Sequence, residues 1–114
     1  MSDREREIIV DRDFLEDLSC WVSTDHKTAR KILELVEAIR RDPFAGIGKP
    51  EPLRNLGSGV WSRRITQEHR LVYKVADHRI FLAKRAIITH RLHIFLYSLD
   101  ITALAPRPVP ASLN

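Results

Sequence analysis

The chain has 114 residues and a mass of 13.2 kDa, enough for one hydrophobic core and therefore for a single domain. With 44% hydrophobic and 30% charged residues, its composition is typical of a soluble globular protein. A single cysteine excludes an internal disulfide, and no Cys and His spacing indicates a zinc site. No segment resembles a signal peptide or the roughly 18 to 20 apolar residues of a membrane span. We therefore expect a cytoplasmic protein without a disulfide framework or a zinc site.

Basic residues are concentrated in the second part of the chain. Residues 1–42 hold eight basic and eleven acidic groups, whereas residues 43–114 hold eleven basic and four acidic groups. This asymmetry favours contact between the second part and a polyanion such as a nucleic acid. A basic, solvated sheet face without any ligand would show the same pattern.

The first part of the chain predicts a strand followed by two helices. A β-branched run predicts a strand over 7–10, and Asp11 is a natural helix N-cap. Apolar spacing then predicts a helix over 12–22 and, after Asp25 as a second N-cap, a helix that ends near Arg41. The apolar faces of these helices are Phe14, Leu15, Leu18, Trp21 and Val22, then Ala29, Ile32, Leu33, Val36 and Ile39.

The second part predicts a loop followed by an antiparallel sheet. Residues 42–59 are rich in glycine and proline and form the loop, with one short strand near Leu53. Strands are expected over 60–66, 70–76 and 79–88, joined by short turns into a meander. The predicted class is α+β, with two helices covering one face of the sheet and the other face available for a ligand.

One carboxylate in the loop, that of Glu51, lies between two prolines. Pro50 and Pro52 fix their own φ near about −65° and disfavour helix in the residue before them, so Glu51 lies on stiff extended backbone. An acid beside fixed positive charge can remove a proton next to a phosphate while the cations stabilise the charge that develops. A solvated surface turn is the plainer interpretation of Pro-Glu-Pro. The positive charges that follow are Arg54, Arg63, Arg64 and Arg70.

Arg63 and Arg64 are adjacent on a predicted strand, so their side chains point to opposite faces of the sheet. Trp61 and Ile65 share the side of Arg63, and Ser62 shares the side of Arg64. We expect one of the two arginines to be functional and the other to be a solvated charge.

Three ungapped stretches closely resemble the YoeB/Txe group of RelE-superfamily toxins: GKPEPL at 48–53, SGVWSRRI at 58–65 and EHRLVY at 68–73. The resemblance extends over about residues 8–82. It implies a RelE-like microbial ribonuclease fold, with the N-terminal strand and helical hairpin on one face of a twisted antiparallel sheet. It also implies the toxin of a type II toxin–antitoxin pair. Such a toxin is a metal-independent, ribosome-dependent endoribonuclease that cleaves mRNA in the A site through attack of the RNA's own 2′-hydroxyl.

The resemblance assigns roles to residues in these motifs. Glu51 is expected to act as general base, and Arg64 and Arg70 are expected to stabilise the phosphate, because a guanidinium stays charged and its fork fits two phosphate oxygens. The expected RNA-binding residues are Lys49, Arg54 and Arg63. For Arg70, a structural ion pair with Glu51 or Glu68 is the alternative.

The likeness stops before the C-terminal strand. Family members typically carry the motif RYHY there, with its His as proton donor and its Tyr against a base, and the ungapped register puts Ile88 and Thr89 at those two places. His90 is the nearest substitute, and a two-residue shift of the strand would bring it to the same face. We expect a toxin domain over 1–89 and a divergent, partly disordered extension over 90–114.

The resemblance also implies partners. These are a Phd/YefM-like antitoxin, the ribosome with its mRNA, operator DNA bound through the toxin–antitoxin complex, and a second copy in a homodimer. The altered C-terminus favours an alternative, a catalytically weakened homologue that retains only antitoxin, operator-complex or ribosome binding. A generic basic α+β RNA-binding module is a third interpretation.

Overall fold

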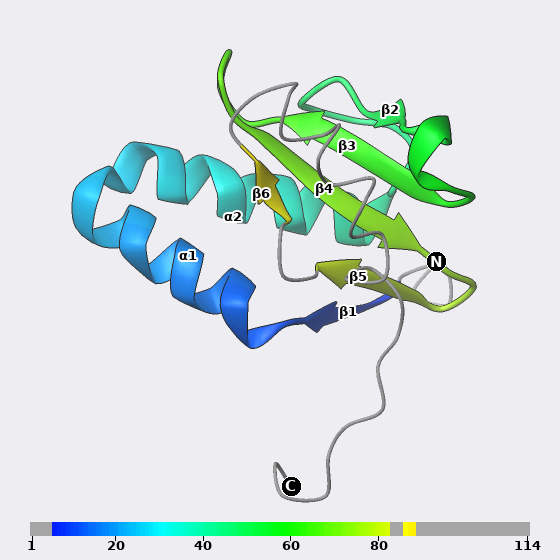
Figure 1. Cartoon of the computed structure of the whole chain (residues 1–114), viewed down its shortest axis with the longest axis horizontal. Coiled ribbons are helices and arrows are strands. Elements are labelled where there is room, and N and C mark those ends of the chain that lie inside the picture. The colour runs from blue at the N-terminus through cyan, green and yellow to red at the C-terminus, as the bar shows by residue number, and fades with distance from the viewer. Residues whose placement is uncertain (1–5, 83–85, 89–114) are drawn as a thin grey trace, which may run out of the picture.

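In the computed structural model, which describes residues 6–82 and 86–88, two helices lie against a mixed sheet (Figure 1). The α+β class predicted from the sequence is confirmed. The elements in chain order are β1 (Glu7–Val10), α1 (Arg12–Thr24), α2 (His26–Arg41), β2 (Glu51–Pro52), the 3₁₀ turn η2 (Arg54–Leu56), β3 (Val60–Arg64), β4 (Arg70–Val75), β5 (Arg79–Leu82) and β6 (Ile87–Ile88).

The strand order in the sheet is β1-β5-β4-β3-β2, and β6 pairs with β4. The expected antiparallel meander is present, because β3, β4 and β5 pair consecutively and antiparallel. The N-terminal strand β1 joins β5 in parallel, so the sheet is mixed. Parallel neighbours need a long crossover connection. Here the chain between β1 and β5 includes both helices, which lets them cover one face of the sheet.

The single strand predicted over 79–88 is two strands. The β4–β5 register pairs Lys74 with Phe81, whereas the β4–β6 register pairs Arg70 with Ile88. A continuous strand would place residue 85 opposite Arg70, so three extra residues separate the two pairings. Both β5 and β6 therefore lie along the same edge of β4, one at each end.

Asp11 and Asp25 begin the two helices, as the sequence predicts. The Asp11 carboxylate accepts a hydrogen bond from the Asp13 amide at 2.8 Å. Asp25 has a double role, because its amide closes α1 on the Trp21 carbonyl while its side chain accepts from the Thr28 amide at 3.2 Å. The turn between the helices is thus a single residue that satisfies backbone groups on both sides.

The core lies between the helices and the strands. It is formed by buried side chains of both helices and of the strands. The helix residues are Phe14 of α1 and Ile32, Leu35 and Ile39 of α2, and the strand residues are Leu71, Tyr73, Ile80 and Leu82. Leu35 is fully buried, although it was not part of the predicted apolar face of α2. Predicted burial is wrong for Leu15, Val22 and Leu33, which are 54%, 53% and 52% exposed. The 3.6-residue period explains the exchange, because positions 32, 35 and 39 share one narrow stripe and position 33 is turned away from it.

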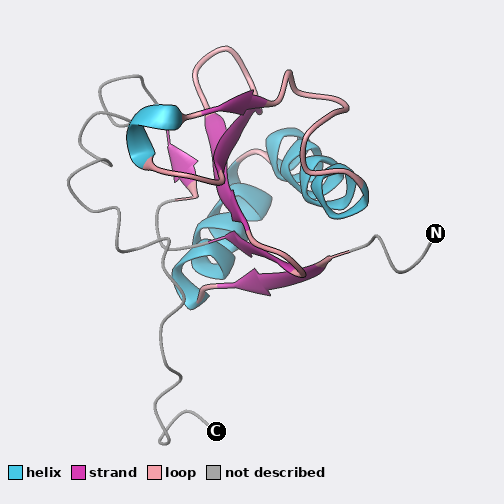
Figure 2. Cartoon of the chain, turned by 90° about the vertical axis from the view of Figure 1, so that its right-hand side faces the viewer, coloured by secondary structure: helices cyan, strands magenta, loops and turns pink. Residues whose placement is uncertain are grey.

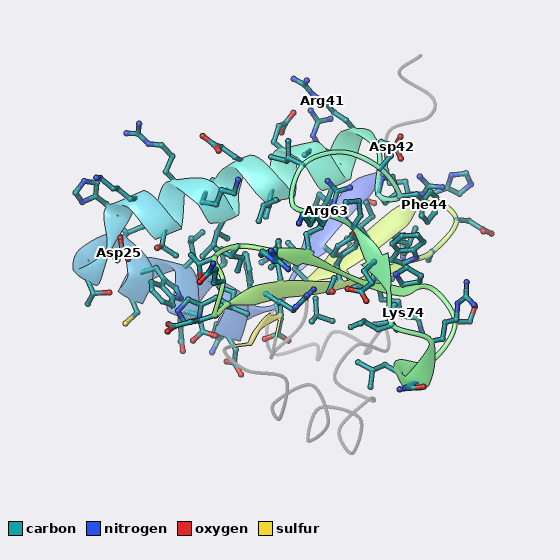
Figure 3. The ribbon with its side chains drawn as sticks, turned by 90° about the horizontal axis from the view of Figure 1, so that it is seen from above. Asp25, Arg41, Asp42, Phe44, Arg63 and Lys74 are labelled. Carbon is teal, nitrogen blue, oxygen red and sulfur yellow. The ribbon has the colours of Figure 1, made fainter. Side chains whose placement is uncertain are left out.

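The two faces of the sheet differ. Arg63 and Leu71 are paired on the helix face, and Ser62 and Val72 are paired on the opposite face. Figures 2 and 3 show η2 on the side of β3 away from α2. This opposite face was expected to be available for a ligand. That is true only in part, because Glu51 and Arg64 are exposed on it whereas Ser62 and Val72 are fully buried.

Candidate active site on the open sheet face

Strand register brings the predicted site residues together. Glu51 pairs with Ser62, and Arg64 pairs with Arg70. Directly opposed residues share a face, as do alternate residues along one strand. Glu51, Ser62, Arg64 and Arg70 therefore lie on the face opposite the helices. Lys74 lies on it too, and Figure 3 shows Lys74 and Arg63 on opposite sides of the strands.

Arg70 links the acid to the sheet. Its Nη1 donates to Glu51 Oε1 at 3.4 Å and to Ser62 Oγ at 3.1 Å. The Glu51 side chain is 57% exposed and the Arg70 side chain 21%, so an incoming ligand can reach the carboxylate. The hydroxyl of buried Ser62 accepts the hydrogen bond from Nη1 and so helps to fix the position of the Arg70 guanidinium. Ser62 was not among the predicted site residues, although its alternation with Arg64 already placed it on this face.

Lys49, Arg54 and Arg64 are exposed cations around this acid. Lys49 directly precedes the Pro50–Glu51 segment and has a positive φ of 52°. Arg54 opens η2, two residues after β2. Within the described residues, no ion pair or side-chain hydrogen bond engages any of these three cations. Their charges are available to a polyanion at the open face.

Arg63 has a different environment. Its side chain is fully buried, and it donates to the Tyr73 hydroxyl and to the backbone carbonyls of Asp42, Ala45 and Ile47. This burial contradicts the prediction that Arg63 binds RNA, because its guanidinium faces the protein interior. It also contradicts the expectation of a solvated charge. Alternation correctly separated the two arginines, but it did not show that the helix side is closed over Arg63.

The C-terminal predictions are only partly within the described residues. Ile88 is opposite Arg70 in the β4–β6 register, so an isoleucine occupies the pairing position next to the site. The two-residue shift that would bring His90 to that position is not present at Ile87–Ile88. His90, Thr89 and the extension over 90–114 lie outside the described residues.

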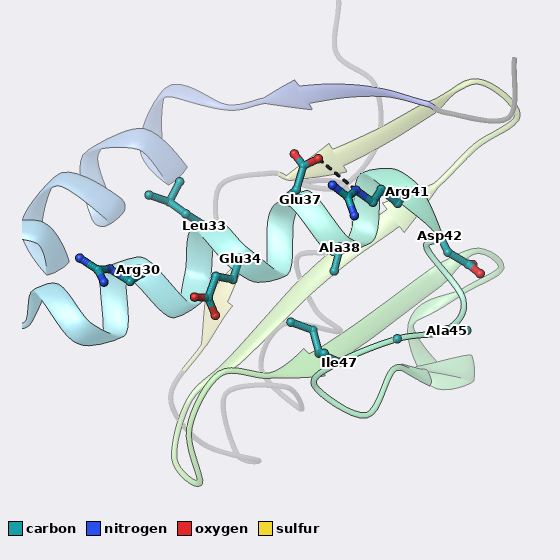
Figure 4. Close-up of a pocket in the computed structure, with 10 residues that line it drawn as sticks. Arg30, Leu33, Glu34, Glu37, Ala38, Arg41, Asp42, Ala45 and Ile47 are labelled. Atoms are coloured by element: carbon teal, nitrogen blue, oxygen red, sulfur yellow. Dashed lines mark ion pairs between the residues drawn. The ribbon is translucent and has the colours of Figure 1, made fainter. Parts of the chain in front are cut away.

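A groove lies elsewhere on the molecule. It has a volume of about 730 Å³ and lies between α2 and the loop that follows, where Leu33, Ala38 and Ile47 form an apolar floor beside the Glu37–Arg41 ion pair (Figure 4). None of the predicted site residues lines it. The candidate active site is therefore separate from this groove and lies on the sheet face, where Glu51 and Arg64 are exposed.

Within residues 6–82 and 86–88, no group of three or more His, Cys, Asp or Glu side chains is arranged to hold a metal ion. The helices in this part of the chain are too short and too polar to cross a membrane.

An acid and a set of guanidinium groups thus share one face of a small α+β sheet. Residues 10–94 match the family model described as YoeB-like toxin of bacterial type II toxin-antitoxin system. The fold and the motifs therefore define a toxin of a type II toxin–antitoxin system. Within that class, the chain belongs to the YoeB family.

Known relatives agree with this assignment. Toxin YoeB from Mycobacterium bovis is 52% identical over 79 residues, which are 69% of this chain and 93% of that protein. The YoeB-YefM complex from Staphylococcus aureus contains a chain that is 40% identical with a TM-score of 0.63, covering 75% of this chain and 97% of its own. The YoeB dimer from Staphylococcus aureus is also 40% identical, with a TM-score of 0.61 and coverages of 68% and 91%.

Proposed function

We propose that the chain is a ribosome-dependent endoribonuclease of the cytoplasm, which cleaves mRNA in the A site and so inhibits translation. The observation that carries the proposal is the contact of Glu51 with Arg70 at 3.4 Å on an exposed sheet face that also holds Arg64. A base beside two cations is the arrangement that cleavage at a phosphate requires when no metal takes part.

In the proposed reaction, the Glu51 carboxylate accepts the proton of the RNA 2′-hydroxyl. The 2′-oxygen then attacks the adjacent phosphorus, and the bond from phosphorus to the 5′-oxygen breaks. The 5′-oxygen leaves with a proton from a general acid or from water, so the products are a 2′,3′-cyclic phosphate and a free 5′-hydroxyl. Arg64 and Arg70 offset the extra negative charge on the pentavalent phosphate.

Arg70 has to serve two partners in this scheme. In the structure its Nη1 is shared between Glu51 and Ser62. A phosphate that binds Arg70 takes the place of the carboxylate, which then becomes free to accept the 2′-hydroxyl proton. Lys49 and Arg54, exposed on either side of Glu51, would hold the RNA backbone.

We also propose that a Phd/YefM-like antitoxin neutralises the toxin, that the chain forms a homodimer, and that its complex with the antitoxin binds operator DNA. The antitoxin is supported by a solved relative described as a YoeB-YefM complex, and the homodimer by one described as a YoeB dimer. Titration with a purified antitoxin should abolish cleavage.

Primer extension on translated mRNA tests the enzymatic proposal. The wild-type chain should produce cleavage within A-site codons, and Glu51→Ala should reduce the cleavage rate by about 10²-fold or more, because a positioned base is lost. Ribosome binding by Glu51→Ala, measured by co-sedimentation, should be retained. A cleavage pattern that is equal for both proteins would refute Glu51 as the base.

A second candidate, a homologue that binds but does not cleave, is favoured by one observation. Ile88 is opposite Arg70, at the place where the family's proton donor is expected, and an isoleucine cannot donate a proton. The same assay decides between the candidates. Absent cleavage by the wild-type chain, together with retained ribosome or antitoxin binding, would establish the binding-only function.

A further inference from the structure

We propose that Arg63, together with Tyr73, is a positioning residue that holds the loop before Glu51 in the geometry needed for cleavage. The inference rests on the proposed function and concerns a side chain that cannot itself touch RNA. Arg63 is fully buried on the helix side of β3, and its two neighbours, Ser62 and Arg64, are on the site side. One strand therefore presents site residues on one face and a loop anchor on the other.

The Arg63 guanidinium is bonded to three carbonyls of one loop. Nη1 donates to Ile47 O at 3.0 Å, and Nη2 donates to Asp42 O at 2.6 Å and to Ala45 O at 3.0 Å. These acceptors span the segment that leads from the end of α2 toward Glu51. A planar guanidinium can bind several acceptors in fixed directions, which an ammonium group cannot do with the same geometry.

Tyr73 completes the anchor from the neighbouring strand. Its hydroxyl accepts from Arg63 Nε at 3.1 Å and donates to Pro43 O at 2.7 Å. Burial raises the pKa of Tyr73, although adjacent Arg63 opposes this shift, so the hydroxyl keeps its proton and remains a donor. Two buried side chains together thus bond four carbonyls of residues 42–47.

Burial of this cation without a carboxylate partner argues for a specific role. None of the ion pairs among the described residues includes Arg63. Removing a charge from water is costly unless hydrogen bonds compensate, and here all of that compensation comes from neutral groups. An apolar side chain would fill the core at lower cost, but it could not bind the loop carbonyls.

The anchored loop is connected directly to the acid. Gly48 O accepts from the Arg64 amide at 2.6 Å, just beyond the anchored carbonyls, and Glu51 follows in register with Ser62. Space around this connection is tight. Gly48 has a φ of 82°, and a Cβ there would be 2.7 Å from the Leu35 side chain. Movement of the loop would therefore move Glu51 relative to Arg70.

Two variants test the proposal. Arg63→Lys keeps the positive charge and loses the planar guanidinium. Tyr73→Phe keeps the aromatic ring in the core and loses only the hydroxyl. Single-turnover cleavage on programmed ribosomes should fall by about 10²-fold in Arg63→Lys and about tenfold in Tyr73→Phe, because a misplacement of about 1 Å has effects of this size. The ribosome concentration for half-maximal rate should change by less than about threefold, since exposed binding groups are untouched.

Phe14→Ala is the matched control, because it removes a buried side chain from α1, an element that takes no part in the hydrogen bonds of Arg63 and Tyr73 with the loop. At a temperature where all variants are folded, Phe14→Ala should cleave at the wild-type rate despite its lower melting temperature. Amide hydrogen exchange should be faster at residues 43–51 in Arg63→Lys and Tyr73→Phe, and unchanged in β5.

Wild-type cleavage and wild-type exchange in Tyr73→Phe and in folded Arg63→Lys would overturn the proposal. An equal loss of cleavage in Phe14→Ala would do the same, since the effect would then be one of general stability. Equal activity of Glu51→Ala and wild type would instead refute the proposed function. In that case the exchange measurement alone still decides whether Arg63 and Tyr73 anchor the loop.

Discussion

Arg70 lies between Ser62, which is buried, and Glu51, which is largely exposed. In the free protein the contact with Glu51 is an ion pair at the surface, and such pairs contribute only about 0 to 1 kcal/mol to stability. The same guanidinium at a phosphate, where charge develops during the reaction, would have a much larger effect on rate. A structural pair and a catalytic cation therefore predict different consequences for the same substitution.

Arg70→Ala should lower the cleavage rate by about 10² to 10³-fold, the range seen when one stabilising donor is lost. The free energy of unfolding should fall by about 1 to 3 kcal/mol, mainly because the buried Ser62 hydroxyl loses its hydrogen bond, while the exposed ion pair with Glu51 adds little. Single-turnover cleavage and urea denaturation measure the two quantities. Unchanged cleavage by the folded variant would make the contact with Glu51 purely structural.

The helical hairpin depends on one carboxylate at the junction of α1 and α2. Asp25 accepts from the Thr28 amide and from the Thr28 hydroxyl, the latter at 2.8 Å. The side-chain hydrogen bond from Thr28, and next the backbone one, lower the pKa of Asp25 below its ordinary value of 3.8. A lowered pKa means that the ionised carboxylate stabilises the folded state, so this contribution is present above pH 3.8 and is lost as pH falls below it.

Asp25→Ala should therefore lower the melting temperature at neutral pH, because α2 loses its side-chain N-cap while the backbone amide that closes α1 is retained. The difference from wild type should shrink as the pH is lowered through the range below 3.8, where the wild-type carboxylate also becomes protonated. Asp25→Asn is the control, since asparagine caps well and does not titrate. A wild-type advantage over Asp25→Ala that is constant down to pH 2 would contradict the linkage.

Across the whole molecule, the sheet separates two kinds of surface. The helices cover the face that contains Arg63, and Lys74 lies on the opposite side of the strands (Figures 1 and 3). By strand register, Glu51, Arg64 and Arg70 share the face of Lys74. Among the described basic residues of the second part of the chain, Arg64, Arg70 and Lys74 thus share one side of the sheet. Charge on that face should attract RNA over distances comparable with the Debye length, about 8 to 10 Å at moderate salt.

Lys74→Ala should weaken ribosome binding several-fold. The slope of log K against the logarithm of the salt concentration should become shallower by about 0.7 to 1, as expected when one phosphate contact is lost. Arg30→Ala is the matched control, because Arg30 is exposed on α2, on the helix side of the sheet. Binding measured over a series of salt concentrations gives both slopes. Equal slopes for the two variants would show that the sheet face is not the RNA-binding surface.

Local features of this protein were accessible from its sequence. Both helix starts were predicted correctly because an aspartate that caps a helix acts within three residues. The meander β3-β4-β5 followed from period-two alternation and short turns, and the extended Glu51 segment followed from its flanking prolines. The joint placement of Glu51, Arg64 and Arg70 was expected from a resemblance in long, ungapped motifs, and the strand register now gives it a geometric basis.

The sequence by itself determined the elements, the caps and which of two adjacent arginines would share a face with Ser62, because those properties depend on near neighbours and on backbone period. Only the tertiary structure decided that Arg63 is buried and bonded to the loop before Glu51, and that the last strand is divided. Each of these depends on what packs against the element from elsewhere in the chain. Carbonyls of a distant loop, not any local signal, made Arg63 a buried cation.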